Sequence, residues 1–130
     1  APLLASSRSI AKRPFLEDTA LQAAYAGARA LILPSEIEGF GLPALEAYYL
    51  GTPVCFVHGT SVEEVLAVAT DKGGFSLDSS ASLLAALKDV MAMHHDEVRA
   101  CGLKLRETYA AEKVAARMIR VFREAILPEH

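Results

Sequence analysis

Short apolar runs alternate along this chain with longer segments in which apolar residues recur every three or four positions. The short runs predict strands, because buried strands of a parallel sheet read as nearly continuous apolar stretches; they lie at residues 12–16, 30–33, 53–58 and 74–77. The periodic segments predict amphipathic helices; they lie at residues 18–28, 43–50, 62–69, 80–93, 96–108 and 111–126. Strands that alternate with helices predict parallel β-α-β units, and therefore an α/β fold with a doubly wound sheet.

Two of the predicted helices have polar residues suited to capping at their starts. Ser61 and Glu64 have the spacing of a capping box, so we expect Ser61 at the N-cap and Glu64 at the third helical position. Asp18 is placed to cap the helix at residues 18–28.

The composition indicates one domain, and it argues against some functions and cellular locations. At 130 residues and 52% hydrophobic composition the chain can fill a single core. A net charge of −3 argues against nonspecific nucleic-acid binding, which needs a dense basic surface. Cys55 lies in an apolar run and Cys101 in a helical one, which predicts buried thiols in a reducing compartment. No run of about 18 uncharged apolar residues occurs, so we expect no membrane span and a cytoplasmic location.

The most informative stretch covers residues 34–54 and reads PSEIEGFGLPALEAYYLGTPV. Pro43 suits a first helical position and Gly51 suits a helix C-terminus, so a short helix follows the glycine-bracketed turn at residues 39–41. Backbone N–H groups at such a helix start attract phosphate. Glu38 and Glu46 flank this start, and carboxylates there suit hydroxyl groups better than phosphate. Phosphate together with hydroxyls indicates a nucleotide-sugar.

The same stretch closely resembles the signature of the retaining glycosyltransferases of family 4, whose fold is called GT-B. That signature reads P-S-x-x-E-G-F-G-L-P-x-L-E-A followed by G-x-P-V, and a weaker resemblance extends over residues 13–78. The resemblance implies that residues 1–130 are one partial, Rossmann-like donor-binding domain, the C-terminal half of GT-B without its first two β-α units. It also implies an acceptor-binding domain upstream of Ala1.

The resemblance assigns roles to both glutamates and to the turn between them. Glu46 would accept hydrogen bonds from the ribose of the donor nucleotide. Glu38 would be the catalytic carboxylate, lying beside the donor sugar and stabilising positive charge that develops in the transition state. Backbone N–H groups would bind the sugar or the diphosphate; they belong to Gly39, Phe40, Gly41 and Leu42.

Simpler readings stay open for several of these residues. Glu46 could be a solvated glutamate that favours the helix dipole, and Glu38 a surface residue of the loop. Family members often have Pro-Glu where this chain has Glu63-Glu64, so Glu64 could contact a ligand, although capping explains it. His58 ends a predicted strand at the ligand-binding edge of the sheet, but a lone histidine is more often structural.

A metal or another cofactor is not expected. No Asp-x-Asp occurs in the chain, which fits a metal-independent transferase. The basic residues of the last predicted helix are read as a solvated face, with contact to the acceptor domain or to an anionic membrane as the minority alternative; they are Arg117, Arg120 and Arg123.

The missing first two units predict an incomplete sheet. In the order 3-2-1-4-5-6 the strand at residues 30–33 pairs with that at residues 53–58, and its other edge lacks its usual neighbour. Solvation of an apolar edge is costly, so we expect the strand near Phe15 to move inward, or a second copy of the chain to cover the edge. Self-association through this edge therefore stays open.

The resulting hypothesis is the donor-binding domain of a metal-independent retaining glycosyltransferase. It would use a nucleotide-sugar and an acceptor glycan, lipid or small molecule, with no nucleic-acid partner, and peripheral association with the inner face of a membrane is left open. By itself the domain is expected to bind donor weakly and to be inactive. The alternative is a non-catalytic nucleotide-sugar binding or scaffold protein; a sugar-nucleotide epimerase of the same fold fits the E-G-F-G segment less well.

Overall fold

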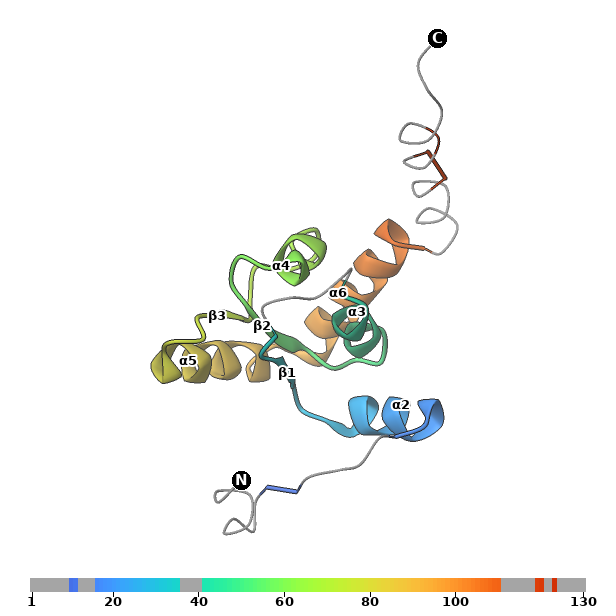
Figure 1. The fold of residues 1–130 in the computed structure, drawn as a ribbon. Coiled ribbons are helices and arrows are strands. Elements are labelled where there is room, and N and C mark those ends of the chain that lie inside the picture. The colour runs from blue at the N-terminus through green and yellow to red at the C-terminus, as the bar shows by residue number, and fades with distance from the viewer. Residues whose placement is uncertain (1–9, 12–15, 36–40, 111–118, 121–122, 124–130) are drawn as a thin grey trace.

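The protein is described here by a computed structural model that covers residues 10–11, 16–35, 41–110, 119–120 and 123. Helices and strands alternate along the first two thirds of the described chain, and two helices complete it (Figure 1). In chain order they are α2 (Asp18–Gly27), β1 (Leu31–Leu33), α3 (Leu42–Tyr49), β2 (Val54–Val57), α4 (Ser61–Leu66), β3 (Gly74–Phe75), α5 (Ser80–Met91) and α6 (His95–Thr108).

The strands form a three-stranded parallel sheet in the order β1-β2-β3. Leu31 lies opposite Val54 in the first pair of strands, and Phe56 lies opposite Gly74 in the second. Figure 1 shows α4 above this sheet, with α5 and α2 below it. The α/β prediction is therefore confirmed, with helices on both faces of a small parallel sheet.

The core is centred on β2, all four of whose residues are buried. A continuous run of Val, Cys, Phe and Val suits a central parallel strand, because such a strand is covered by helices on both faces. Tyr48 of α3 and Leu105 of α6 are also fully buried, and α3 packs along α6. Cys55 and Cys101 are buried free thiols, as expected from the sequence.

The described sheet bears out one part of the edge prediction. β1 pairs with β2, and no strand of the described residues pairs with the other edge of β1. Residues 12–15 of the expected strand near Phe15 lie outside the described residues, and Leu16 is not in a strand. How that edge is covered, and self-association through it, stay predictions.

Both capping assignments made from the sequence were wrong by one residue. α4 has Thr60, not Ser61, as its N-cap, which places Glu63, not Glu64, at the third helical position. The Thr60 hydroxyl donates to the Val57 carbonyl at 2.8 Å, and this bond holds Thr60 in the extended conformation of an N-cap. α2 begins at Asp18, with Glu17 as its N-cap.

Other element boundaries differ slightly from the prediction. β3 has only two residues, since the N–H of Ser76 bonds to the Ser82 hydroxyl at 3.0 Å instead of extending the strand. Most of the predicted helix at residues 111–126 lies outside the described residues, although Ile119, Arg120 and Arg123 are helical.

Candidate functional site

The start of α3 lies at the carboxyl edge of the sheet, where open α/β sheets bind ligands. Its N-cap is Gly41, with φ 81° and ψ 31°, a left-handed conformation that glycine adopts readily. The Gly41 carbonyl accepts hydrogen bonds from the N–H groups of Ala44 at 3.0 Å and Leu45 at 3.2 Å. Leu42 is the first helical residue, and it is 58% exposed. Gly41 and Leu42 therefore lie at a helix start that faces the carboxyl edge.

The electrostatics of this helix start favour an anion. Pro43, which the sequence predicted at the first helical position, is the second residue of α3, and the first turn contains no acidic residue. The partial positive charge of a helix N-terminus is thus not balanced by a carboxylate of its own first turn. The other three residues proposed around the turn, Glu38, Gly39 and Phe40, lie outside the described residues.

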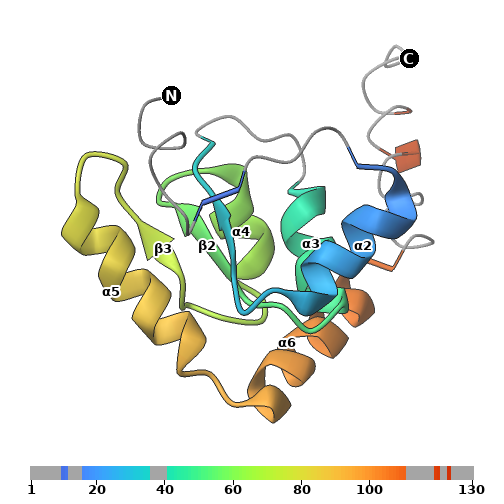
Figure 2. The ribbon, with the colours of Figure 1, turned by 90° about the horizontal axis from the view of Figure 1, so that it is seen from below.

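Glu46 lies one turn into α3 and is exposed. It borders a hollow of about 220 Å³ between α2, α3 and α6, the three helices grouped together in Figure 2; the other residues that line it are Gln22, Tyr49, Leu50 and Arg106. The Arg106 guanidinium lies 4.8 Å from the centroid of the Tyr49 ring, a cation–π contact. The sequence pattern identified Glu46 but gave no signal for Gln22 or Arg106, because both come from other helices.

His58 and Glu63 are joined by a hydrogen bond at the end of β2. His58 Nδ1 lies 2.8 Å from Glu63 Oε2, and the N–H of Gly59 donates to Glu63 Oε1 at 3.1 Å. The hydrogen bond from His58, and then that from Gly59, lower the pKa of the Glu63 carboxyl below its usual range. Glu64, the residue that the sequence singled out, is exposed on α4.

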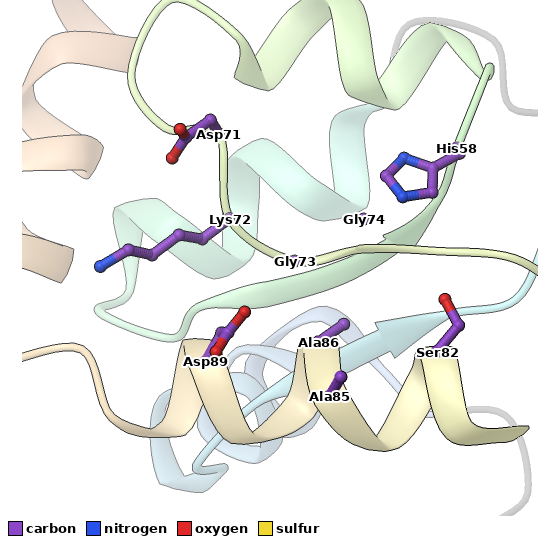
Figure 3. A pocket seen from close by; sticks show the side chains of 9 residues that line it. All are labelled: His58, Asp71, Lys72, Gly73, Gly74, Ser82, Ala85, Ala86 and Asp89. Atoms are coloured by element: carbon purple, nitrogen blue, oxygen red, sulfur yellow. The ribbon is translucent and has the colours of Figure 1, made fainter.

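Figure 3 shows the His58 imidazole lying over Gly74, beside a cavity between β3 and α5. A β-carbon on Gly74 would collide with this ring, so glycine is needed for the ring to lie there. The cavity has a volume of about 440 Å³ and is lined by His58, Asp71, Lys72, Gly73, Gly74, Ser82, Ala85, Ala86 and Asp89. Lys72 is paired with Glu97 at 2.9 Å, which leaves the cavity with two carboxylates and no unpaired lysine among its lining residues.

Other chemistry receives little support from the described residues. They contain no group of three or more His, Cys, Asp or Glu side chains arranged to hold a metal ion. Burial raises the pKa of the Cys55 thiol to about 11, so it is protonated at neutral pH and poorly suited to act as a nucleophile. No helix in the described part of the chain has the length and hydropathy that a bilayer crossing requires.

Comparison with known proteins agrees with the family resemblance of residues 34–54. Residues 13–119 match the family model described as "Glycosyl transferases group 1". The chain is 30% identical over 115 residues to the MMP alpha-(1->4)-mannosyltransferase of Mycolicibacterium hassiacum, an alignment that covers 85% of this chain and 28% of that protein. It is 46% identical over 52 residues to the O-antigen chain mannosyltransferase B of Escherichia coli, which covers 40% of this chain and 14% of that protein.

The chain thus spans less than a third of the length of either curated relative. No solved structure gives a significant match. Because the family model covers most of the chain, from the region before α2 to beyond α6, the chain belongs to the family of group 1 glycosyl transferases.

Proposed function

We propose that this chain is the donor-binding, C-terminal GT-B domain of a retaining family 4 glycosyltransferase. The observation that carries the proposal is the start of α3, a helix N-terminus without an acidic first turn, set at the carboxyl edge of a parallel sheet and followed one turn later by Glu46. This arrangement suits a ligand with both a diphosphate and hydroxyl groups. The complete protein would transfer a sugar from a nucleotide-sugar to an acceptor and retain the anomeric configuration. The names of both relatives favour mannose.

In this proposal the backbone N–H groups and the two carboxylates bind different parts of the donor. The N–H groups of the turn would bind the diphosphate or the sugar; they belong to Gly39, Phe40, Gly41 and Leu42. Glu46 would accept hydrogen bonds from the ribose, and Glu38 would lie beside the sugar. A fixed anion there accelerates the reaction to the extent that positive charge appears only in the transition state.

The same proposal has consequences for the cofactor, the acceptor and the location of the enzyme. The helix start would neutralise the leaving diphosphate together with basic residues of an acceptor-binding domain, so no metal ion or other cofactor is required. The acceptor would be a glycan, a lipid or a small molecule, and the enzyme would work in the cytoplasm or at the inner face of a membrane. The domain alone would bind donor weakly and catalyse nothing.

The complete gene product, incubated with nucleotide-sugars and candidate acceptors, provides the test. NMR of the product reports the anomeric configuration, and retention is the expected result. Inversion would overturn the assigned mechanism. Binding of a nucleotide-sugar without turnover on any acceptor would favour the alternative, a non-catalytic binding or scaffold protein.

A further inference from the structure

The turn between β2 and α4, residues 58–60, is held by side chains at both of its ends. Glu63 reaches back from the first turn of α4 and uses both carboxylate oxygens, one on His58 Nδ1 at 2.8 Å and one on the Gly59 N–H at 3.1 Å. The Thr60 hydroxyl donates to the Val57 carbonyl at 2.8 Å. Three hydrogen bonds therefore fix where α4 begins relative to the end of β2.

The His58 side chain is 56% exposed, and its ring lies beside two residues of the sheet. It lies over Gly74, and its plane meets the Phe56 ring at 87°, with 6.5 Å between centroids. Because the ring lies against one residue of β2 and one of β3, its bond to Glu63 links the first turn of α4 to the sheet.

The start of α4 in turn lies directly against the start of α3. A β-carbon placed on Gly41 would lie 3.4 Å from Val62 Cγ2 and 3.6 Å from Val62 Cα, so the two residues pack with no side chain of Gly41 between them. Val62 is only 1% exposed and immediately precedes Glu63. A shift of the first turn of α4 would therefore move the neighbour on which Gly41 rests, since closely packed interiors transmit displacements.

We infer that Glu63 is a positioning residue for the donor site: through His58 and Gly59 it holds Val62 against Gly41, and so sets the backbone geometry at the start of α3. The consequence for ligand binding rests on the proposed function. Glu64 has no such role, because it is exposed on α4 and neither of these hydrogen bonds involves it.

Three variants of the 130-residue chain test whether Glu63, and not Glu64, has the positioning role. They are Glu63→Ala, Glu63→Gln and the matched control Glu64→Ala. We would record amide NMR spectra of each ¹⁵N-labelled chain and titrate it with GDP, UDP and ADP. Glu63→Ala should shift the Gly41 and Leu42 amide resonances and weaken the affinity for the bound nucleotide about 3- to 10-fold, an effect typical of coupling between packed elements. Glu63→Gln should restore most of both, since an amide oxygen still accepts from Gly59. Glu64→Ala should change neither.

Two results would overturn the inference. One is an unchanged Gly41 resonance in Glu63→Ala; the other is an affinity loss of equal size in Glu64→Ala. If Glu63→Ala does not fold, His58→Ala removes one of the two bonds and should shift the same resonances by less, and no shift there would also reject the inference. Absence of nucleotide binding by the unsubstituted chain would count against the proposed function, while the Gly41 resonance would still decide the positioning role.

Discussion

The two strand–helix units at the carboxyl edge, β1–α3 and β2–α4, begin their helices in opposite ways. α4 has Thr60 as its N-cap and two acidic residues in its first turn, one of which, Glu63, bonds back to the preceding turn. α3 has Gly41 as its N-cap and no acidic residue in its first turn. A carboxylate in the first turn balances the positive end of a helix, whereas a start without one still attracts an outside anion. This difference is the reason why we propose the start of α3, and not the start of α4, for the donor diphosphate.

The largest effect is expected from Glu38, which precedes α3 in the sequence and has no equivalent before α4. In the complete enzyme, Glu38→Gln should lower turnover about 10²-fold, as loss of one preorganised charge-stabilising group does. The donor KM should change little, because the lost interaction belongs to the transition state. Steady-state kinetics with the nucleotide-sugar measure both. A chelator should leave the rate of the unsubstituted enzyme unaffected; equal losses in both parameters, or inhibition by the chelator, would contradict this mechanism.

Glu46 should give the next largest effect, on binding. Glu46→Ala should weaken nucleotide diphosphate binding by about 1–3 kcal/mol, the usual cost of losing a charged hydrogen-bond partner. Titration calorimetry measures the loss, with Glu64→Ala as the control because Glu64 is an exposed glutamate on the other helix. Equal affinities of Glu46→Ala and the unsubstituted chain would remove Glu46 from the site.

Gly41 is the N-cap of α3 and Gly59 immediately precedes the N-cap of α4, so the same substitution can be compared at both glycines. Their φ angles are 81° and 79°, but a β-carbon on Gly41 would touch Val62 while one on Gly59 would meet nothing within 4 Å. Alanine at either position should lower the free energy of unfolding by about 1–2 kcal/mol, the cost of a left-handed conformation. Urea denaturation measures this loss. Only Gly41→Ala should also weaken nucleotide binding strongly, and equal affinity losses would show that the two helix starts do not differ toward the ligand.

The smallest effect is expected on the pH dependence of the stability that Glu63 contributes at the start of α4. Because the folded state lowers the pKa of Glu63, its stabilisation is present above the usual carboxyl pKa of about 4.3 and is lost as the pH falls through the lower folded value. The pair is partly exposed, so Glu63→Gln should cost only about 0.2–1 kcal/mol at pH 7. This difference should shrink below about pH 4, as measured by denaturant unfolding. Glu64→Gln is the control, and a difference that grows below about pH 4 would reverse the assigned sign.

The sequence by itself determined the fold class and the start of the candidate site. An apolar run predicted β2 because a parallel strand that is buried on both faces requires such a run. A similar run predicted β1, although Ile32 of that strand is exposed. Pro43 placed the start of α3 to within one residue, since proline is favoured in the first turn of a helix. These features depend on residues that are close together in the chain, so they can be predicted from a single sequence.

Only the tertiary structure decided which side chains support the site. The sequence favoured Glu64 through a capping box, but the N-cap moved to Thr60 because its hydroxyl bonds to the end of β2, and the third helical position then fell on Glu63. Likewise, Gln22 and Arg106 come from separate helices and line the same hollow as Glu46. Which residues of different helices come together depends on how the helices pack, and the spacing of residues along the chain does not predict that packing.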